Sequence, residues 1–420
     1  MNSIRKQTLL AAGAAAVALS AAPAYAQDAS ETSPLASVLE PPPAKSTYLD
    51  LTGSLGWSSN PFVQTVDSES SFLGRASARG VHAWRGERSA SSISAFVEGT
   101  TYFSNYGLES IFAVNGDTSY DVSETVTVYG SASVTGDLSG QLSNRFLFVP
   151  PVPPIPNPNV PPPPPTVENP DVFDFAGRSY HIFGQGGASI QTGTRSNVGI
   201  TAGVSRAIYD APQLDEYTSV FATGSYNVTL SERTSVGGML SVTRTGYDNS
   251  SNHSTTINPA ATINTRLSEA WSARATVGVT FSKVDRQLTE DSSVNLSLNG
   301  SICRTTESER LCGRVDRYSA SSANSTLITT TSAGVDWYKK LDDVQTVQLS
   351  ATASHYVDEV LNLERKTNHF SLLASYSRMI NERLSGGVDL GARSLHRDDL
   401  DADTDITGTV FVRYRIGDLG

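Results

Sequence analysis

The segment from Leu267 to Phe281 alternates between apolar and polar side chains without a break. After a short polar turn over 267–270, one set of alternate positions is apolar: Trp271, Ala273, Ala275, Val277, Val279 and Phe281. The positions between them carry Ser272, Arg274, Thr276, Gly278 and Thr280. Because neighbouring side chains of a β-strand point to opposite faces, this segment predicts a strand with one apolar and one polar side. Such a strand suits the wall of a membrane barrel or a half-buried position in a soluble sheet.

A short turn recurs along the chain and divides it into hairpins. It has an apolar residue, then Ser, Asn or Asp, then an acidic residue, as in 122–125, 230–233, 267–269, 341–343 and 380–383. Its acidic residues Glu232 and Glu269 are 37 positions apart, and Asp343 and Glu382 are 39 apart. A fixed period of this size indicates one repeated structural unit. The predicted unit is a pair of long strands with one short turn and one longer loop.

The repeat predicts an all-β fold, a transmembrane antiparallel up-and-down β-barrel of about 16 strands. Strands of about 12 to 15 residues exceed the usual 5 to 6 of soluble sheets and are long enough for a tilted membrane crossing. An even count keeps both termini on the periplasmic side. That side also receives the short turns, and the longer loops become extracellular. We therefore prefer the membrane barrel to a soluble sandwich.

The first 26 residues have the three parts of a secretory signal peptide. Arg5 and Lys6 give the positive start, an apolar stretch follows, and 24–26 is a small-residue cleavage site. We predict cleavage there, with a retained membrane anchor as the alternative. Residues 27–46 then form a periplasmic lead-in, and residues 47–420 form the barrel in the outer membrane of a Gram-negative bacterium.

Two of the predicted extracellular loops are long. Residues 137–178 are rich in proline, and their run Pro161 to Pro165 favours an extended polyproline II conformation. Residues 285–324 are polar and contain both cysteines of the chain, Cys303 and Cys312. In an exported protein these two cysteines are expected to form a local disulfide that closes this loop. Free thiols or a metal-binding pair are the alternatives.

The polar faces of the predicted strands define a candidate lumen. Its charged side chains are predicted to be Arg266, Arg274, Asp336, Asp389, Arg393, Arg413 and Arg415. A barrel of about sixteen strands is wide enough for an aqueous lumen, and hydroxyl-rich walls suit polar or sugar-like solutes. The charges either tune selectivity or pair with one another across the lumen and stiffen the wall.

Other classes of function have little support in the sequence. The net charge of −11 argues against nucleic acid as a partner. Asn252-His253-Ser254 places its imidazole and hydroxyl on opposite faces of a strand, so the two do not form a catalytic pair. The stretch Asp398 to Asp405 lacks the glycine and closing glutamate of an EF-hand, and a solvated loop is favoured over a calcium site. We expect no catalysis, no cofactor and no bound metal.

The hexapeptide Trp57-Ser58-Ser59-Asn60-Pro61-Phe62 follows the first predicted strand. It resembles the Asn-Pro/Ile-aromatic element near the start of many proteins of the β-barrel porin 2 family. Gly246-Tyr247-Asp248-Asn249 looks like a second such loop start. The resemblance implies an outer-membrane barrel associated with exopolysaccharide gene clusters, and hence polysaccharide or another polar solute as a partner.

The expected function is therefore porin-like passage or docking of polar solutes. Outer-membrane lipid, lipopolysaccharide and the barrel assembly machinery are the other expected partners. Many barrels end in an aromatic residue that the assembly machinery recognises, whereas here Phe411 and Tyr414 precede the tail 417–420. The alternative function is a structural or surface-interaction barrel with an occluded lumen.

Overall fold

The computed structural model describes ten segments of the chain: residues 45–61, 69–104, 107–138, 178–210, 214–248, 250–286, 290–323, 325–360, 363–397 and 400–418. The predicted signal peptide, the lead-in up to residue 44 and most of the proline-rich segment, 139–177, lie outside the described residues. The two remaining lead-in residues, Lys45 and Ser46, already belong to the first strand.

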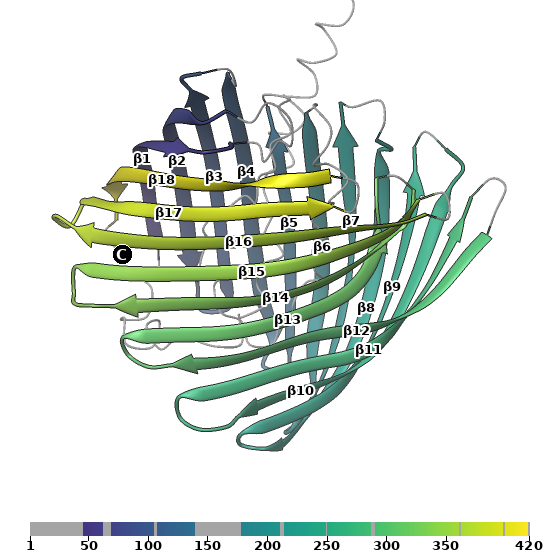
Figure 1. Ribbon diagram of the computed structural model, residues 1–420. Helices are drawn as coiled ribbons and strands as arrows, with labels where there is room; N and C mark the ends of the chain where they lie inside the picture. The colour runs from purple at the N-terminus through teal and green to yellow at the C-terminus, as the bar shows by residue number, and fades with distance from the viewer. Residues whose placement is uncertain are drawn as a thin grey trace, which may run out of the picture.

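Within these segments, eighteen antiparallel strands form one closed barrel (Figure 1). They are β1 (Lys45–Ser58), β2 (Ser71–Arg85), β3 (Ser89–Tyr102), β4 (Leu108–Ser123), β5 (Val126–Asp137), β6 (Ser179–Gly193), β7 (Ser196–Tyr209), β8 (Tyr217–Ser231), β9 (Thr234–Tyr247), β10 (His253–Arg266), β11 (Trp271–Asp285), β12 (Glu290–Thr305), β13 (Glu309–Ser321), β14 (Leu327–Lys340), β15 (Gln345–Val360), β16 (Leu363–Met379), β17 (Leu384–Arg397) and β18 (Leu400–Gly417). Each strand pairs with its neighbours in the chain, and β18 pairs back with β1 to close the cylinder. The predicted all-β, up-and-down barrel is confirmed.

The two strands beyond the predicted sixteen are β12 and β13. They occupy the segment 285–324, so the prediction of a long extracellular loop there was wrong. Asp285 pairs with Glu290 across a short connection, and the ladder then continues through β12 and β13 to β14. The polar composition of this segment had suggested a loop. A lumen that holds water accepts charged side chains on its wall, so polarity alone does not mark a loop in such a barrel.

The repeated turn of the sequence closes hairpins at one end of the barrel. In each copy the Ser, Asn or Asp side chain accepts a hydrogen bond from the backbone N–H two residues later, at 2.9 to 3.3 Å: Ser123 from Thr125, Ser231 from Arg233, Ser268 from Ala270, Asp342 from Val344 and Asn381 from Arg383. Side chains of this type fold back on their own backbone and thereby favour tight turns. The predicted hairpin turn is confirmed, and its polar second residue shapes it.

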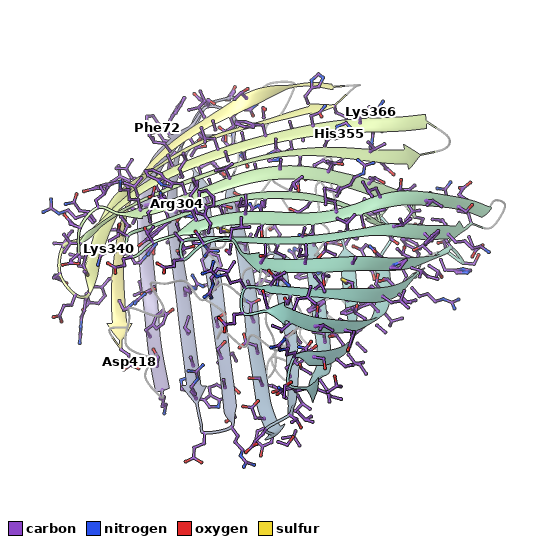
Figure 2. The ribbon with its side chains drawn as sticks, turned by 90° about the horizontal axis from the view of Figure 1, so that it is seen from below. Phe72, Arg304, Lys340, His355, Lys366 and Asp418 are labelled. Carbon is purple, nitrogen blue, oxygen red and sulfur yellow. A yellow bond between two sulfur atoms is a disulfide. The ribbon has the colours of Figure 1, made fainter. Side chains whose placement is uncertain are left out.

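The barrel has two unlike ends. The short-turn end carries these turns, together with the start of β1 at Lys45 and the end of β18 at Gly417. The long-loop end carries longer connections such as 59–70 and 210–216. In Figure 2, Lys340 at the short-turn end of β14 lies toward one side, and His355 of β15 and Lys366 of β16 lie toward the other. If the barrel sits in an outer membrane, the short-turn end faces the periplasm.

The outer face of the barrel is apolar. Val277 pairs with Ala261 on one side and with Leu298 on the other, so one apolar row crosses β10, β11 and β12. Large apolar side chains on this face are exposed, for example Leu55 at 67%, Phe72 at 67%, Val294 at 66% and Val410 at 61%. A surface this apolar is favourable against lipid and unfavourable against water. In the described part of the chain no helix is long and apolar enough to span a membrane.

Candidate functional site

A cavity of about 1060 Å³ lies inside the barrel along the inner faces of β5 to β13. It begins at the short-turn end, at Glu232 and Arg266, and reaches Tyr217 and Ser321 near the long-loop end. Most of its walls are hydroxyl and amide side chains. These bond to each other between strands, as in Ser219 Oγ to Thr245 Oγ1 at 2.7 Å, Thr223 to Ser241 at 3.0 Å and Ser297 to Asn258 at 3.2 Å. Such walls offer a polar, mostly uncharged path to a solute.

The seven charged residues predicted for the lumen all occupy inner-face positions of the strand register, but they do not form one group. Arg266 and Arg274 line the cavity, and Arg274 donates from Nε to Asn264 Oδ1 at 2.6 Å. Asp336 and Asp389 each accept a hydrogen bond from a serine on the next strand, Ser350 at 2.7 Å and Ser375 at 2.6 Å. The remaining three, Arg393, Arg413 and Arg415, lie on β17 and β18.

Pairing of Arg with Asp along the wall does occur, but mostly with partners that the sequence did not indicate. Arg393 pairs with Asp405 at 3.0 Å, and Arg415 pairs with Asp50 at 2.7 Å. Asp336 pairs with Arg314 at 3.0 Å. Each pair joins neighbouring strands at or near directly opposite positions. The register of the sheet creates these pairs, and a single sequence does not display that register.

Asp405 anchors the first long-loop connection onto the inner wall. Its side chain is buried, and its Oδ1 accepts hydrogen bonds from Ser58 Oγ at 2.7 Å and from the Asn60 backbone N–H at 3.1 Å. Its Oδ2 accepts from Arg393 Nε and from Thr407 Oγ1, both at 3.0 Å. A buried carboxylate needs hydrogen-bond donors to its oxygens, and Asp405 has donors to both of them. The solvated loop predicted for Asp398 to Asp405 was therefore wrong for Asp405.

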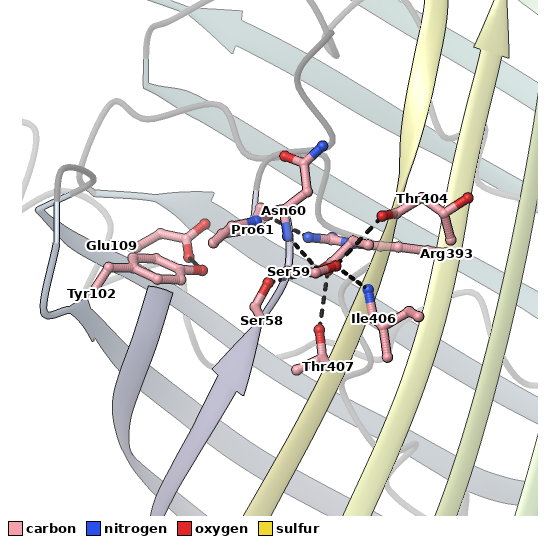
Figure 3. Close-up of polar contacts among 11 residues, drawn as sticks. Ser58, Ser59, Asn60, Pro61, Tyr102, Glu109, Arg393, Thr404, Ile406 and Thr407 are labelled. Carbon is pink, nitrogen blue, oxygen red and sulfur yellow. Dashed lines mark hydrogen bonds and ion pairs between the residues drawn. The ribbon is translucent and has the colours of Figure 1, made fainter. Parts of the chain in front are cut away.

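The same anchor holds the backbone of the Ser58 to Pro61 segment. Arg393 Nη2 donates a hydrogen bond to the carbonyl oxygen of Pro61, and Ser59 Oγ accepts one from the Ile406 N–H at 2.7 Å (Figure 3). Asn60 is only 2% exposed. The Ser-Ser-Asn-Pro sequence that carried the family resemblance thus turns the chain inward over β17 and β18. The sequence signal was present, but its partner Asp405 lies 345 residues away.

A second contact joins two connections across the long-loop end. The Asp215 N–H donates to the carbonyl oxygen of Ala323 at 2.8 Å, and Ser325 Oγ donates to Asp215 Oδ2 at 2.7 Å. These residues lie between β7 and β8 and between β13 and β14, so the contact bridges the strands in between. Around it, Ala207, Leu214, Tyr217, Tyr247 and Ala323 bury one another. The long-loop end is therefore narrowed by structured, packed chain.

The two cysteines form the predicted disulfide, but not in an extracellular loop. Cys303 on β12 and Cys312 on β13 lie directly opposite each other, with their Cα atoms 4.1 Å apart. They stand beside the 306–308 turn, at the short-turn end. The bond closes a β-hairpin of the barrel wall.

Loss of this disulfide is expected to destabilise the barrel modestly. Replacing Cys303 and Cys312 with serine should lower the free energy of unfolding by about 2 kcal/mol, at the low end for disulfides because the closed loop is short. Urea unfolding in detergent micelles measures the change. A reductant should produce the same loss in the wild type and none in the double variant. An unchanged unfolding midpoint would show that the hairpin does not depend on the bond.

The residues weighed for catalysis do not assemble a reactive group. His253 Nε2 pairs with Asp285 at 3.0 Å, and the two lie opposite each other in the β10–β11 ladder. Ser254 is on the other face and bonds to Ser321 at 2.5 Å. Over the residues that the structure describes, no group of three or more His, Cys, Asp or Glu is arranged to hold a metal ion.

Several solved structures are similar to this chain. A BenF-like porin from Pseudomonas fluorescens Pf-5 matches with a TM-score of 0.45 at 8% identity, covering 89% of this chain and 98% of the porin. Pseudomonas aeruginosa OccK2 (OpdF) matches with a TM-score of 0.45 at 11% identity, covering 89% of this chain and 98% of OccK2. The FrpB iron transporter from Neisseria meningitidis matches with a TM-score of 0.44 at 7% identity, covering 91% of this chain and 83% of the transporter. No protein-family model matches the sequence, and no curated protein matches it.

Proposed function

We propose that the chain is a porin-like barrel of the outer membrane that gives small polar solutes a restricted passage. One observation carries this proposal: a cavity lined by hydroxyl and amide groups lies inside a closed barrel with an apolar outer face. Apolar outside and polar inside is the arrangement that a membrane barrel requires. The cavity walls match solutes that carry many hydroxyl groups. Each hydroxyl or amide group of the wall can replace its hydrogen bond to a neighbouring side chain with one to the solute.

The link to exopolysaccharide is a narrower proposal and rests on the resemblance at residues 57–62. The inward-folded connections at the long-loop end favour short saccharides over a polymer chain. The same connections would still let the end of a polysaccharide chain dock at the long-loop end. A flanking cluster of polysaccharide genes would support this part of the proposal, and its absence would remove the main support.

The proposed location brings two kinds of partner. Lipid and lipopolysaccharide would cover the outer face, including the row through Val277. The barrel assembly machinery would meet the last strand, where Tyr414 faces outward and is 42% exposed, whereas Phe411 is on the inner face and only 6% exposed. Tyr414 is therefore the better candidate for the aromatic assembly signal. Replacing Tyr414 with serine should then reduce assembly more than replacing Phe411 does, as measured by the heat-stable fraction on unboiled gels.

Single-channel recording in planar bilayers tests the proposed passage. The purified full chain is expected to conduct, and liposomes that contain it should swell in neutral sugars of small size more quickly than in larger ones. The competing function, a structural barrel with an occluded lumen, is favoured by the packed contact at Asp215 and Ala323. Absence of both conductance and swelling would support that alternative.

Weakening the mouth contact should distinguish a narrow channel from a plugged barrel. The double variant Asp215→Ala/Ser325→Ala removes both partners of a 2.7 Å hydrogen bond, at a cost of about 0.5 to 1.5 kcal/mol. We expect larger or more frequent openings than in the wild type. The matched control is Thr346→Ala, which removes a serine–threonine hydrogen bond of 2.7 Å at the short-turn end and should leave conductance unchanged. Equal behaviour of both variants would exclude the contact as the restriction.

A further inference from the structure

Three arginines gather around a single carboxylate on the inner face of β18, β1 and β2. Asp50 of β1 lies directly opposite Arg415 of β18 on one side and Arg79 of β2 on the other. Arg413 lies two residues before Arg415 and therefore on the same face. Arg79 interacts electrostatically with Asp50, Arg413 and Arg415, which places all four groups in one cluster. We call Arg79, Arg413, Arg415 and Asp50 the arginine cluster.

The carboxylate of the cluster is already committed to one arginine. Arg415 donates from Nε to Asp50 Oδ1 at 2.7 Å and from Nη2 to Asp50 Oδ2 at 2.8 Å. The same guanidinium lies over the ring of Tyr48, 4.2 Å from its centre. A two-point pair of this kind uses the planar guanidinium and both carboxylate oxygens. Asp50 thus neutralises the charge of Arg415.

The other two arginines have no carboxylate partner of their own in the described residues. The Nη2 atom of Arg79 is buried and forms no hydrogen bond within the described part of the chain. Arg413 is exposed on the inner face, and its contact there is with the ring of Phe411, 5.7 Å away. Arginine keeps its charge at any ordinary pH, so the cluster carries about two excess positive charges.

Three other arginines of the inner wall each pair with a carboxylate. Arg75, the next inner-face arginine on β2, pairs with Glu98 at 3.3 Å. Arg314 and Arg393 pair with Asp336 and Asp405 at 3.0 Å each. A purely structural wall would gain from one carboxylate for each arginine, because neighbouring like charges repel. Here the register brings three arginines together with only one.

We propose that the arginine cluster is an anion-binding subsite of the lumen, which takes a carboxylate or phosphate group of a passing solute. An oxyanion fits the planar guanidinium donors, and a partly buried position strengthens the attraction. The cluster lies on the inner face of β18, β1 and β2, and the hydroxyl-lined cavity is bounded by other strands, β5 to β13. A solute with both an acidic group and hydroxyl groups would bind the arginine cluster through the acidic group and the cavity wall through its hydroxyl groups. This inference deepens the proposed passage and rests on it for access to solutes.

The test compares two variants that lose the same positive charge from the inner wall. Arg79→Gln/Arg413→Gln removes the two arginines that lack a carboxylate, and Arg75→Gln/Arg314→Gln removes two that are paired with Glu98 and Asp336. Inorganic phosphate and succinate are the probes, with glucose as the neutral control. In planar bilayers the wild type should favour anions, and phosphate should block its chloride current. The first variant should weaken this block about tenfold or more, because two charge-assisted contacts are lost, whereas the second should change it less than about threefold.

A binding measurement separates this inference from the proposed function. Phosphate binding to the full chain in detergent is followed by calorimetry, which needs no conductance. If the barrel does not conduct but the wild type binds phosphate and Arg79→Gln/Arg413→Gln does not, the subsite stands and the passage fails. If the barrel conducts but phosphate and succinate neither bind nor block, the passage stands and the subsite is overturned. Similar weakening in both variants would also overturn the subsite, because the effect would then follow wall charge in general.

Discussion

Replacing Asp405 with alanine is expected to lower the free energy of unfolding by about 3 to 5 kcal/mol. The variant would leave Arg393 in a largely buried position without its carboxylate. Removing one partner of a buried ion pair lowers the free energy of unfolding by about this amount, because the other charge stays buried and unpaired. It would also free the Ser58 hydroxyl and the Asn60 N–H, which both donate to Asp405. Urea unfolding in detergent micelles, followed by tryptophan fluorescence, measures the loss.

Two further variants make the reason for this loss specific. Asp336→Ala removes a carboxylate whose pair with Arg314 is more exposed, with side chains 37% and 44% accessible, and should cost no more than about 1 kcal/mol. Arg393→Met/Asp405→Leu removes both partners of the buried pair and should recover part of the stability lost in Asp405→Ala. If Asp405→Ala and Asp336→Ala were equally mild, the segment from Ser58 to Pro61 would not depend on this anchor.

The sequence predicts well what is local in the barrel. The alternation around Val277 assigns one face of β11 to the outside, and the structure continues that face through Ala261 and Leu298. The turn pattern works for the same reason, because Ser268 and Asn381 bond to backbone atoms only two residues away. A single sequence contains all the information for contacts this close in the chain.

The polar composition of residues 285–324 led to a wrong prediction of a loop. In a soluble protein a polar segment favours a loop, whereas the inner wall of this barrel accepts polar strands. The alternation of Val294, Leu296 and Leu298 in β12 is as regular as that in β11, but the cysteines and charges that follow suggested a loop. The inner face of such a wall does not need to be apolar, so Arg314 and Asp316 sit within a regular strand. The count of sixteen strands was low by the two strands of this hairpin.

Long-range contacts at the candidate site were not accessible from the sequence. Asp50 and Arg415 are 365 residues apart in the chain, and they meet only because β18 closes the barrel against β1. The same closure brings Asp405 to Asn60. Whether a lumen charge tunes selectivity or pairs with another charge and stiffens the wall therefore depends on the register of the strands. Within the described residues, the register gives Arg393 and Arg415 a carboxylate each and gives none to Arg79 or Arg413.

Replacing Val277 with arginine is expected to destabilise the barrel by about 2 to 4 kcal/mol, the cost of a charge facing lipid near the middle of the membrane. Val277 is 48% exposed on the outer face, in the apolar row of β10, β11 and β12. The natural control is a neighbour on the inner face. Gly278 is unsuitable, because a Cβ atom there would lie 2.5 Å from the Pro259 carbonyl oxygen and 2.6 Å from the Ala260 Cβ.

Thr276 is the better control, since it is next to Val277, lines the cavity and already carries a β-branched side chain. Thr276→Arg should fold nearly as well as the wild type in lipid vesicles, because its charge enters the aqueous lumen and not the lipid. The fraction of heat-stable barrel on unboiled gels reports assembly, and urea titration in vesicles reports stability. In detergent, which wets the outer face more readily than lipid does, the gap between Val277→Arg and Thr276→Arg should shrink. Equal damage from both substitutions in vesicles would mean that lipid does not cover the face of Val277, and the barrel would then not be a membrane-spanning one.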